Sequence, residues 1–317
     1  MASQSIPVRV VTAETVAKNI RAYTLAREDG ETLPAFGAGA HIDVLTDNGL
    51  TRQYSLCGDP TNTQEYKIAV QLEEQGRGGS SWIHANIHTA SEIQINPPRN
   101  HFELDESADH YLLIAGGIGI TPIMLMGQRL QALGKNFSFY YLARSLEHAA
   151  FAEQLRNTFG ERLHCYFSDA VDERLNIAEL FAQQSEVTEI YTCGSEHLLQ
   201  AILDAAEPHP NLTVHFERFA AVEQDNSDNT SFEIELARSG KVLTVSPDQT
   251  ILEVLRGEGF TVETMCEEGL CGSCEVDLLS GEADHRDSVL NEAEKAEQSV
   301  LMVCCSRAVS PRLKLDI

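Results

Sequence analysis

Cysteine spacing is the strongest chemical signal in this 317-residue sequence. Cys266, Cys271 and Cys274 have the spacing C-x4-C-x2-C, and Cys304 lies 30 positions beyond Cys274. Four thiolates at this plant-type spacing hold a 2Fe–2S cluster. Two glycines lie in the same loop, and small residues let backbone N–H groups point at the anionic cluster. The sequence therefore predicts a 2Fe–2S cluster and electron-transfer chemistry.

Two alternatives concern this group of cysteines. A structural zinc site is the first, but zinc sites usually carry two C-x2-C pairs, and this sequence has one. The second concerns the fourth ligand, because Cys304 and Cys305 are adjacent. The spacing favours Cys304, and Cys305 is then expected to be a small buried apolar residue.

A glycine-rich turn provides the second candidate site. It reads Gly116-Gly-Ile-Gly-Ile-Thr-Pro122 and stands between an apolar run and a helical pattern. It differs from G-x-G-x-x-G, but it too places a tight turn and a helix N-terminus where they can face phosphates. Arg144 and the pair Cys193-Gly194 follow two further strand patterns, and open α/β sheets bind ligands at such strand ends. The plainer interpretations are a turn without a ligand, a solvated arginine and a packed cysteine.

Two segments of the first third are candidates for a flavin. Arg52-Gln-Tyr-Ser55 offers a guanidinium to phosphate, an aromatic ring and a hydroxyl. Gly76-Arg-Gly-Gly-Ser80 offers backbone amides, Arg77 and Ser80 to a phosphate. A plain edge strand and a flexible surface loop are the respective alternatives. Trp82, the one tryptophan, is expected in the core.

The elements that must position these residues change in character along the chain. The first third has short alternating strand patterns at 41–45, 51–56 and 66–72. Gly, Pro, Asn and Asp separate them, which predicts a small antiparallel barrel. The middle third has apolar strand patterns at 111–115, 137–142 and 189–193, with helical patterns at 123–133 and 198–206. This alternation predicts a parallel sheet with helices on both faces.

The last third begins after a polar segment without periodicity. Residues 222–230 have the composition of an interdomain linker. A hairpin pattern at 232–236 and 241–245 and a helical pattern at 250–256 then precede the cysteines. Two strands and a helix before a cysteine loop predict a small, compact third domain.

Composition excludes several classes of function. The formal charge is −25 and the pI is about 4.7, which argues against nucleic acids and anionic membranes, since both attract Lys and Arg. No apolar run approaches the roughly 18 residues of a membrane span, and the N-terminus lacks a secretory signal pattern. We therefore expect a cytoplasmic protein, where clustered cysteines favour metal or redox chemistry over disulfides.

With these sites in this order, the chain resembles the phthalate dioxygenase reductase family, particularly the vanillate demethylase reductases within it. The resemblance covers essentially the whole chain. It rests on Arg52-Gln-Tyr-Ser-Leu-Cys57, Gly76-Arg-Gly-Gly-Ser80, Pro98-Arg-Asn-His-Phe102, Gly116-Gly-Ile-Gly-Ile-Thr-Pro122, Tyr191-Thr-Cys-Gly-Ser195, His215-Phe-Glu-Arg-Phe219, the cysteine loop, Asp284-His-Arg-Asp287 and Cys304-Cys-Ser-Arg307. Family members often have valine where this chain has Cys305, which supports Cys304 as the ligand.

The resemblance implies a multidomain plan of three parts. Residues 1–105 would form an antiparallel FMN-binding β-barrel, and 106–221 an α/β NAD-binding domain with a parallel sheet. Residues 222–230 would be a linker, and 231–317 a C-terminal β-grasp ferredoxin domain of the plant type. Reductases with the ferredoxin at this end use FMN, whereas relatives with it at the front generally use FAD.

The resemblance also implies the binding residues. FMN would contact Arg52, Gln53, Tyr54, Ser55, Ile68, Ala69, Val70, Arg77, Gly79 and Ser80. NADH would contact Gly117, Thr121, Arg144, Cys193 and Gly194. Glu217 and Phe219 would lie near the flavin ring and the nicotinamide, and the cluster would be held by Cys266, Cys271, Cys274 and Cys304.

The implied activity is an electron relay without a general acid or base. NADH would give a hydride to FMN, and electrons would leave singly through the cluster to a separate Rieske-type terminal oxygenase. The expected reaction of that oxygenase is demethylation or hydroxylation of an aromatic acid of the vanillate or phthalate type. We recognise no Rieske ligand pattern and no 2-His-1-carboxylate set in the sequence, so oxygen activation is expected in another protein.

Three alternatives to this function remain open from the sequence. The partner could be a carnitine or other quaternary-amine monooxygenase, because those reductases share the same motifs. A redox sensor with flavin and cluster but no sustained turnover is a different class of function. NADPH could replace NADH, because a 2′-phosphate requires positive charge and Arg144 could supply it.

Overall fold

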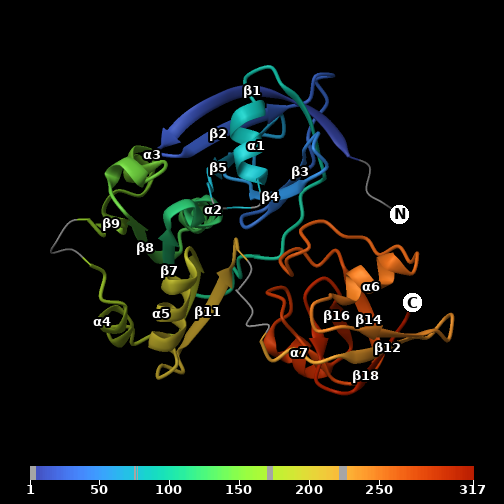
Figure 1. The fold of residues 1–317 in the computed structure, drawn as a ribbon. Helices are drawn as coiled ribbons and strands as arrows, with labels where there is room; N and C mark the ends of the chain where they lie inside the picture. The colour runs from blue at the N-terminus through green and yellow to red at the C-terminus, as the bar shows by residue number, and fades with distance from the viewer. Residues whose placement is uncertain (1–4, 75, 77, 170–173, 221–226) are drawn as a thin grey trace. The chain divides into compact units, whose positions relative to one another are not determined.

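The computed structural model describes residues 5–74, 76, 78–169, 174–220 and 227–317. The chain divides into two compact units, Met1–Glu217 and Arg218–Ile317 (Figure 1). Among the described helices, none combines the length and the apolar character that a membrane crossing demands.

The first unit opens with an antiparallel barrel. Its strands are β1 Ile6–Ala17, β2 Ile20–Ala26, β3 His41–Leu45, β4 Thr51–Ser55, β5 Glu65–Gln71 and β6 Glu92–Ile95, and helix α1 is Gly79–Asn86. The strand order is β4-β3-β6-β1-β2-β5. A bridge between Leu56 and Ile68 joins the two ends of this order and closes the barrel. The predicted antiparallel barrel is therefore confirmed.

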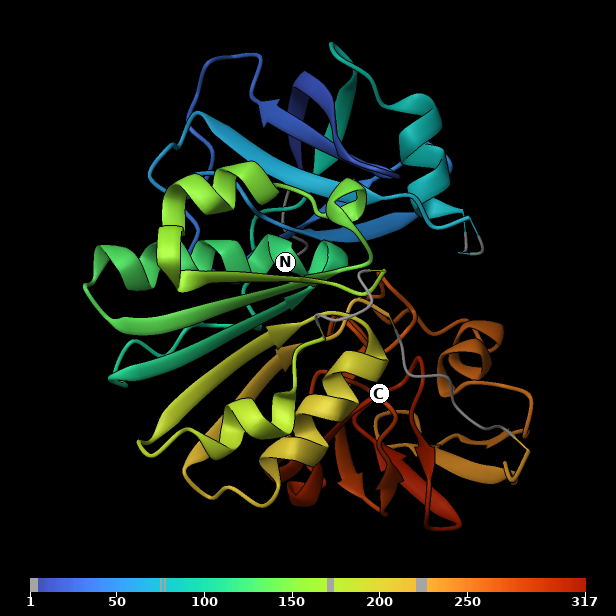
Figure 2. The same ribbon diagram turned by 90° about the vertical axis from the view of Figure 1, so that its left-hand side faces the viewer.

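A five-stranded parallel sheet forms the rest of the first unit, in the order β11-β10-β7-β8-β9 (Figure 2). Its strands are β7 His110–Gly116, β8 Asn136–Ala143, β9 Leu163–Phe167, β10 Thr188–Cys193 and β11 Leu212–Glu217. The helices are α2 Ile120–Ala132, α3 Ala152–Phe159, α4 Ile177–Ala182 and α5 Glu196–Ala206. Short 3₁₀ turns lie at Gly117–Gly119, Leu146–His148 and Gly160–Arg162.

Both faces of the parallel sheet are covered, because successive side chains of a strand point to opposite faces. Leu113 and Ala115 of β7 pack in the core that contains α2 and α3. Leu112 and Ile114 pack with α4 and α5. The predicted parallel sheet with helices on both faces is confirmed.

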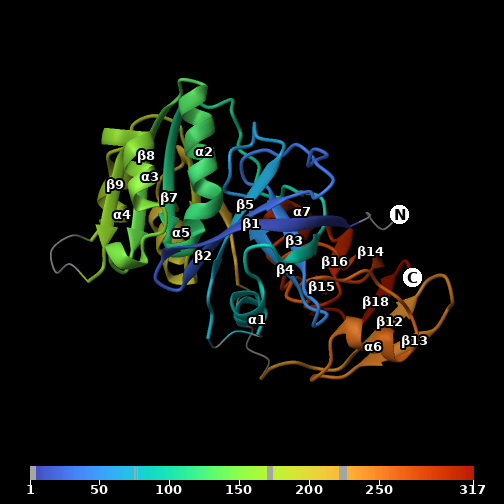
Figure 3. The ribbon, with the colours of Figure 1, turned by 90° about the horizontal axis from the view of Figure 1, so that it is seen from above.

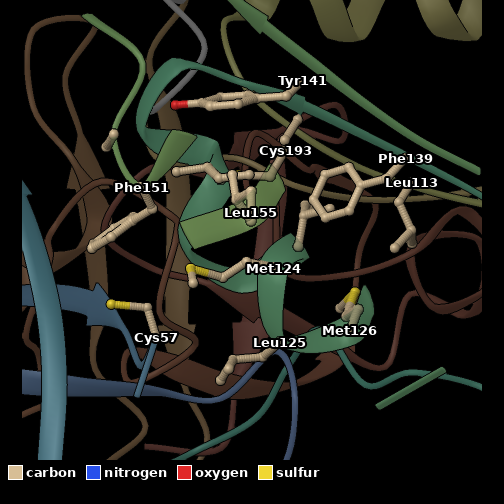
Figure 4. Packing of buried hydrophobic residues seen from close by; sticks show 14 of the residues in the cluster. Cys57, Leu113, Met124, Leu125, Met126, Phe139, Tyr141, Phe151, Leu155 and Cys193 are labelled. Carbon is tan, nitrogen blue, oxygen red and sulfur yellow. The ribbon is translucent and has the colours of Figure 1, made fainter. Parts of the chain in front are cut away.

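The barrel and the parallel sheet share one hydrophobic core. Ile20, Ala22, Cys57 and Ala69 of the barrel belong to the same cluster of buried residues as α2 and α3. Figure 4 shows Cys57 beside Met124 of α2 in this cluster. The shared core packs α2 and the parallel sheet against β2 and β5, so the two parts form one compact unit.

The second unit is built around a mixed five-stranded sheet (Figure 3). Its elements are β12 Phe232–Leu236, β13 Val242–Val245, α6 Ile251–Gly257, β14 Glu275–Ser280, β15 Ala283–Asp284, α7 Glu292–Glu297, β16 Val300–Met302, β17 Arg307–Ala308 and β18 Arg312–Leu315. The order is β13-β12-β18-β14-β16. β12 and β18 are parallel, while the other pairs are antiparallel. Helix α6 packs its buried face, Ile251, Leu252 and Leu255, on this sheet. The predicted β-grasp fold is confirmed.

Two elements differ from the sequence patterns. The segment 76–80 was expected as a loop, but Gly79 and Ser80 begin helix α1. The long β1–β2 hairpin had no prediction, because its turn places Asn19 rather than glycine at a positive φ of 60°. The predicted linker lies partly outside the described residues at 222–226, and the predicted domain boundaries stay predictions.

Candidate functional site

The second unit brings the four predicted cluster ligands together. Cys274 directly precedes β14, and Cys304 lies just after β16. The two strands are antiparallel and pair at Glu275 and Met302, so both cysteines lie at the same end of this strand pair. Cys266 and Cys271 come from the loop before β14. All four thiols are buried, which removes them from water and from adventitious oxidants.

Hydrogen bonds link the thiols of Cys266 and Cys271 and those of Cys274 and Cys304, and Cys304 also contacts the thiol of Cys305. A 2Fe–2S cluster has two irons, each of which takes two thiolates, whereas zinc draws four thiolates around one centre. Hydrogen bonding from Cys266 lowers the pKa of the Cys271 thiol, which favours the thiolate that a metal requires. Across the described residues, no group of three or more His, Cys, Asp or Glu side chains is arranged for a single metal ion. The two-by-two arrangement fits a 2Fe–2S cluster.

Backbone amides of the loop point at these sulfurs. Glu268 N and Leu270 N each lie 3.4 Å from Cys266 Sγ, and the backbone of Gly269 hydrogen-bonds to Cys304. Gly269 has a φ of +70°, and a Cβ there would lie 2.6 Å from Cys305 Sγ. Cys305 therefore packs behind the loop, and its thiol donates to the carbonyl of Met302 at 3.8 Å. This contact supports Cys304 as the fourth ligand.

In the first unit, Arg52 of β4 lies across the N-terminus of α1. A Cβ on Gly79 would overlap the Arg52 side chain, whose Cγ is 2.7 Å from that position. The first amides of a helix lack partners within the helix and carry positive partial charge. A guanidinium beside such amides offers the donors that a phosphate group requires. The cradle fits the FMN phosphate. Arg77, predicted for the same site, lies outside the described residues.

We predict that Arg52→Ala weakens FMN binding without unfolding the barrel. Loss of charge-assisted hydrogen bonds to phosphate costs about 1.5–3 kcal/mol, or roughly 10–100-fold in Kd. Fluorescence titration of the apoprotein with FMN measures the change. Arg9→Ala is the control, because Arg9 makes an exposed ion pair with Glu28. Equal FMN affinity in the two variants would contradict this assignment.

The remaining predicted flavin residues take two kinds of position. Tyr54 and Gln53 lie on β4, and Gln53 Nε2 is 3.1 Å from Nε2 of the buried His41. On β5, the side chains of Ile68 and Val70 belong to the barrel core and that of Ala69 to the shared core. These three can therefore meet a ligand only through their backbone. The Ser80 hydroxyl accepts a hydrogen bond from Glu73 N at 3.0 Å.

The predicted NADH residues lie at the carboxyl edge of the parallel sheet. Gly117 begins the 3₁₀ turn after β7 at a φ of +55°, and a Cβ there would meet nothing within 4 Å. Arg144 is exposed at the end of β8, and Cys193 ends β10. This edge is the usual ligand position of open α/β sheets, and the open space at Gly117 fits a nucleotide.

Two of the predicted NADH residues support the turns instead of projecting from them. The Thr121 hydroxyl donates to the carbonyl of Ile118 at 3.0 Å. A Cβ on Gly194 would lie 3.1 Å from Gly116 Cα and 3.0 Å from Leu198 Cδ2. The two glycine turns therefore pack backbone against backbone, and this contact explains both glycines without a ligand.

Gly119→Ala is expected to destabilise this edge. The new Cβ would overlap the carbonyl of Cys193 and lie 2.8 Å from Gly194 N, and neither backbone atom can move independently. Overpacking of this kind costs about 1–3 kcal/mol, and the displaced turn should also raise the KM for NADH. Urea unfolding and NADH–ferricyanide kinetics measure the two effects. Gly37→Ala is the control, because its nearest neighbour would be 3.9 Å away; equal losses in both variants would refute the prediction.

Three polar side chains from separate strands meet at a buried point of the first unit. Ser55 ends β4, Cys193 ends β10 and Glu217 ends β11. Burial raises the pKa of Glu217 to about 8, and weak hydrogen bonding to the Ser55 side chain, which lowers this pKa, offsets only part of the effect. The Glu217 carboxylate in turn adds to the burial that raises the pKa of Cys193.

The buried point is incomplete without a ligand. Among the described residues, neither Ser55 Oγ nor Glu217 Oε2 has a hydrogen-bond partner of good geometry. Buried polar atoms normally have partners, and a flavin ring edge or a nicotinamide carboxamide can supply them. The arrangement fits a flavin and a nicotinamide held close together. Phe219, predicted for the same place, is 40% exposed and belongs to the second unit.

Two residues near these sites had no prediction from the sequence. Gly119 lets the turn after β7 approach Cys193, and the signal available was the third glycine of the motif. His41 holds Gln53 from the neighbouring strand. Its burial lowers the imidazole pKa to about 4, so the ring is neutral, and only strand pairing could have revealed its role.

Family models match two parts of the chain. Residues 234–309 match the model of a 2Fe-2S iron-sulfur cluster binding domain. Residues 91–210 match the N-terminal domain of dimethylamine monooxygenase subunit DmmA-like proteins. The first match contains all four predicted cluster ligands and agrees with the paired thiols.

Two curated relatives align over nearly the whole chain. The vanillate O-demethylase oxidoreductase of Pseudomonas sp. strain HR199 is 40% identical over 98% of this chain and 100% of its own. The carnitine monooxygenase reductase subunit of Escherichia coli K12 is 39% identical over 99% of both chains.

Two solved structures are also similar. One is an intact type IV self-sufficient cytochrome P450 monooxygenase, with 39% identity and a TM-score of 0.90 over 99% of this chain. This chain spans only 41% of the length of that P450 chain. The other is phthalate dioxygenase reductase, described as a modular structure for electron transfer from pyridine nucleotides to [2Fe–2S]. It has 37% identity and a TM-score of 0.74 over 99% of this chain and 98% of its own.

These likenesses agree with the sites found in both units. They confirm the predicted family, the three-part fold and the 2Fe–2S cluster domain. With relatives 40% identical over 98% of its length, the chain belongs to the phthalate dioxygenase reductase family of flavin and iron–sulfur oxidoreductases.

Proposed function

We propose that this protein transfers electrons from NADH through FMN and a 2Fe–2S cluster to a separate terminal oxygenase of the Rieske type. The observation that carries the proposal is the meeting of Ser55, Cys193 and Glu217 at one buried point. One of these residues comes from the barrel and two from the sheet. The flavin site and the nicotinamide site therefore share their polar contacts.

The residues of the first unit bind and orient the two cofactors. Arg52 and the α1 amides hold the FMN phosphate, and the turn 117–119 with Arg144 holds the nucleotide. Glu217 keeps its proton below pH 8 because its carboxyl is buried, and it can donate that proton in a hydrogen bond. Bound FMN supplies the exchange between a two-electron hydride and a one-electron acceptor.

The other predicted contacts and boundaries form part of the same proposal. Gln53, Tyr54 and Ser55 would line the flavin, as would backbone groups of Ile68, Ala69 and Val70, the helix start at Gly79 and Ser80, and Arg77. Gly117, Thr121, Cys193 and Gly194 would line the nicotinamide nucleotide, and Phe219 the ring. The domains would be 1–105, 106–221 and 231–317. A cytoplasmic location stays a prediction.

The partner class rests on the relatives. Oxygenase reductases such as the vanillate and carnitine proteins align from end to end, and they favour a separate partner with an aromatic acid or a quaternary amine as substrate. The likeness to a P450 chain favours a second candidate, in which the acceptor is a haem oxygenase. We place the Rieske partner with an aromatic acid first, because the vanillate, phenoxybenzoate and phthalate relatives are 38–40% identical to this chain, against 35–39% for the carnitine relatives.

The test compares acceptors at equal concentration under anaerobic conditions. The NADH-reduced protein is mixed in a stopped-flow instrument with a vanillate-demethylating Rieske oxygenase, a carnitine-type Rieske oxygenase, or a P450 haem protein. We expect the Rieske centre of an aromatic-acid oxygenase to be reduced fastest. Faster reduction of the carnitine-type centre would change the proposed substrate of the partner from an aromatic acid to a quaternary amine. Reduction of the haem protein alone would contradict the Rieske assignment.

A further inference from the structure

The cysteine loop contains an unusual backbone conformation at Glu267, directly after the ligand Cys266. Glu267 has a φ of +56°, in the left-handed region. The same loop uses glycine at its other two positive-φ positions, Gly269 and Gly272. A side chain in this region is strained, and it persists only where the surroundings hold it. A glutamate side chain at this position can provide an interaction that glycine could not.

That interaction is an ion pair with helix α6. Arg256 in the last turn of α6 bonds through one guanidinium nitrogen to Glu267 Oε1 at 2.6 Å and to Thr264 Oγ1 at 2.6 Å. Thr264 Oγ1 also lies 3.3 Å from Glu267 Oε1. The helix itself is anchored by a complete capping box between Thr250 and Glu253 and by its buried face. The loop is thus tied to a fixed element at the residue that follows the first ligand.

The turn at Glu267 decides where the next amides point. Glu268 N and Leu270 N lie 3.4 Å from Cys266 Sγ, and both follow the left-handed residue in the chain. Hydrogen bonds to cluster sulfurs stabilise the more negative reduced state and raise the reduction potential. A change of φ at Glu267 would rotate the Glu268 amide away from the sulfur.

We propose that Arg256 and Glu267 are positioning residues for the cluster, an inference that rests on the proposed function. Their ion pair holds the left-handed turn that points two backbone amides at Cys266. These amides raise the reduction potential of the cluster. The pair is exposed, with 44% and 43% of the two side chains accessible. Exposed ion pairs weaken with salt. The potential of the cluster therefore depends on ionic strength through this pair.

The sign of the potential shift separates this role from a plain charge effect. Removing the negative Glu267 would raise the potential if only its charge mattered, and removing the positive Arg256 would lower it. Loss of amide alignment lowers the potential in both cases. We therefore expect Glu267→Gln, Glu267→Ala and Arg256→Gln to shift the midpoint potential in the same, negative direction, because none of these variants keeps the ion pair and none places glycine at the left-handed position. The double variant Arg256→Gln/Glu267→Gln should have the same midpoint potential as the single variants, because each single substitution already removes the ion pair.

The experiment is an EPR-monitored redox titration of the full-length protein at low and high salt, with iron release to a chelator as a second readout. A tenfold weaker affinity for the electron would appear as about 59 mV in this one-electron couple. Arg238→Gln is the matched control, because it breaks an exposed ion pair with Asp316 of the same unit without touching the loop.

The outcomes are decisive for the ion pair. We expect the variants of both residues to have a lower midpoint potential and to release iron faster than the wild type. Their midpoint potential should also depend less on salt. Opposite shifts for Glu267→Gln and Arg256→Gln would leave only a charge effect and overturn the proposal. Wild-type behaviour of Glu267→Ala would show that the backbone turn needs no ion pair, which also overturns the proposal. A wild-type protein without any cluster EPR signal would instead refute the proposed function.

Discussion

Cys304→Ser is expected to abolish electron delivery beyond the flavin while leaving the flavin reaction intact. Serine oxygen is a poor replacement for a cluster thiolate, so NADH-dependent reduction of cytochrome c should fall by more than the roughly 10–100-fold that loss of a ligand's hydrogen-bond partner costs a metal site. Ferricyanide takes electrons from the flavin directly, so NADH–ferricyanide activity should persist, because Cys304 lies in the second unit and the flavin site in the first. Iron content and the cluster absorbance give the parallel structural readout.

Cys305→Ser is the matched variant for this prediction. Cys305 is the neighbouring thiol and donates to the Met302 carbonyl, a contact that a serine hydroxyl can retain. We expect near-normal iron content and cytochrome c reduction. If Cys305→Ser lost the cluster and Cys304→Ser kept it, the fourth ligand would be misassigned.

Glu217→Gln is expected to change the pH dependence of flavin reduction by NADH more than its rate at neutral pH. The pKa of Glu217 is raised to about 8 by burial, so the carboxyl is neutral at pH 7 and is able to donate a hydrogen bond to a bound flavin. Above pH 8 the buried carboxylate disfavours the negative charge that the flavin gains with a hydride. The wild-type rate should therefore fall about tenfold per pH unit above 8, and glutamine, a neutral donor, should keep a flat profile.

Stopped-flow absorbance of the flavin band between pH 6 and 9.5 measures these rates. Identical pH profiles for the wild type and Glu217→Gln would show that another group titrates. Asp105 provides a control, because hydrogen bonding to Ser107 lowers its pKa and it cannot titrate in this window. Asp105→Asn should therefore retain the wild-type profile.

The carboxyl of Glu217 also makes the free energy of unfolding depend on pH. Its pKa is about 8 in the folded protein against 4.5 in the reference state, so the folded state binds the proton more tightly. The stabilisation is complete below pH 4.5, declines as pH rises, and is lost above pH 8. In the apoprotein, Glu217→Gln should remove this decline from the free energy of unfolding measured in urea.

Local features of this chain could be predicted from the sequence. The cysteine spacing lies within one loop and one strand pair, so Cys266, Cys271 and Cys274 needed no tertiary information. The strands 41–45 and 232–236 match β3 and β12, because alternation of apolar residues is a local signal. The turn after β7 was visible for the same reason, since its glycines are consecutive in the sequence.

Features that depend on distant contacts could not be predicted in this way. The unsatisfied carboxyl of Glu217 arises only when β11 packs beside Ser55 of the barrel. The clash at Gly119 involves the carbonyl of Cys193, 74 positions away in the chain. Helix α1 was missed because Gly78, Gly79 and two serines have low helix propensity, whereas Ile83 packs in the barrel core and stabilises the helix.

An anaerobic NADH titration of the purified protein, followed by absorbance and low-temperature EPR, tests the central claim most directly. We predict bleaching of both the flavin and the iron–sulfur bands, with an S = 1/2 signal of a reduced 2Fe–2S cluster. Bleaching of the flavin without any cluster signal would mean that electrons do not reach the four cysteines, and the electron-transfer account would be wrong.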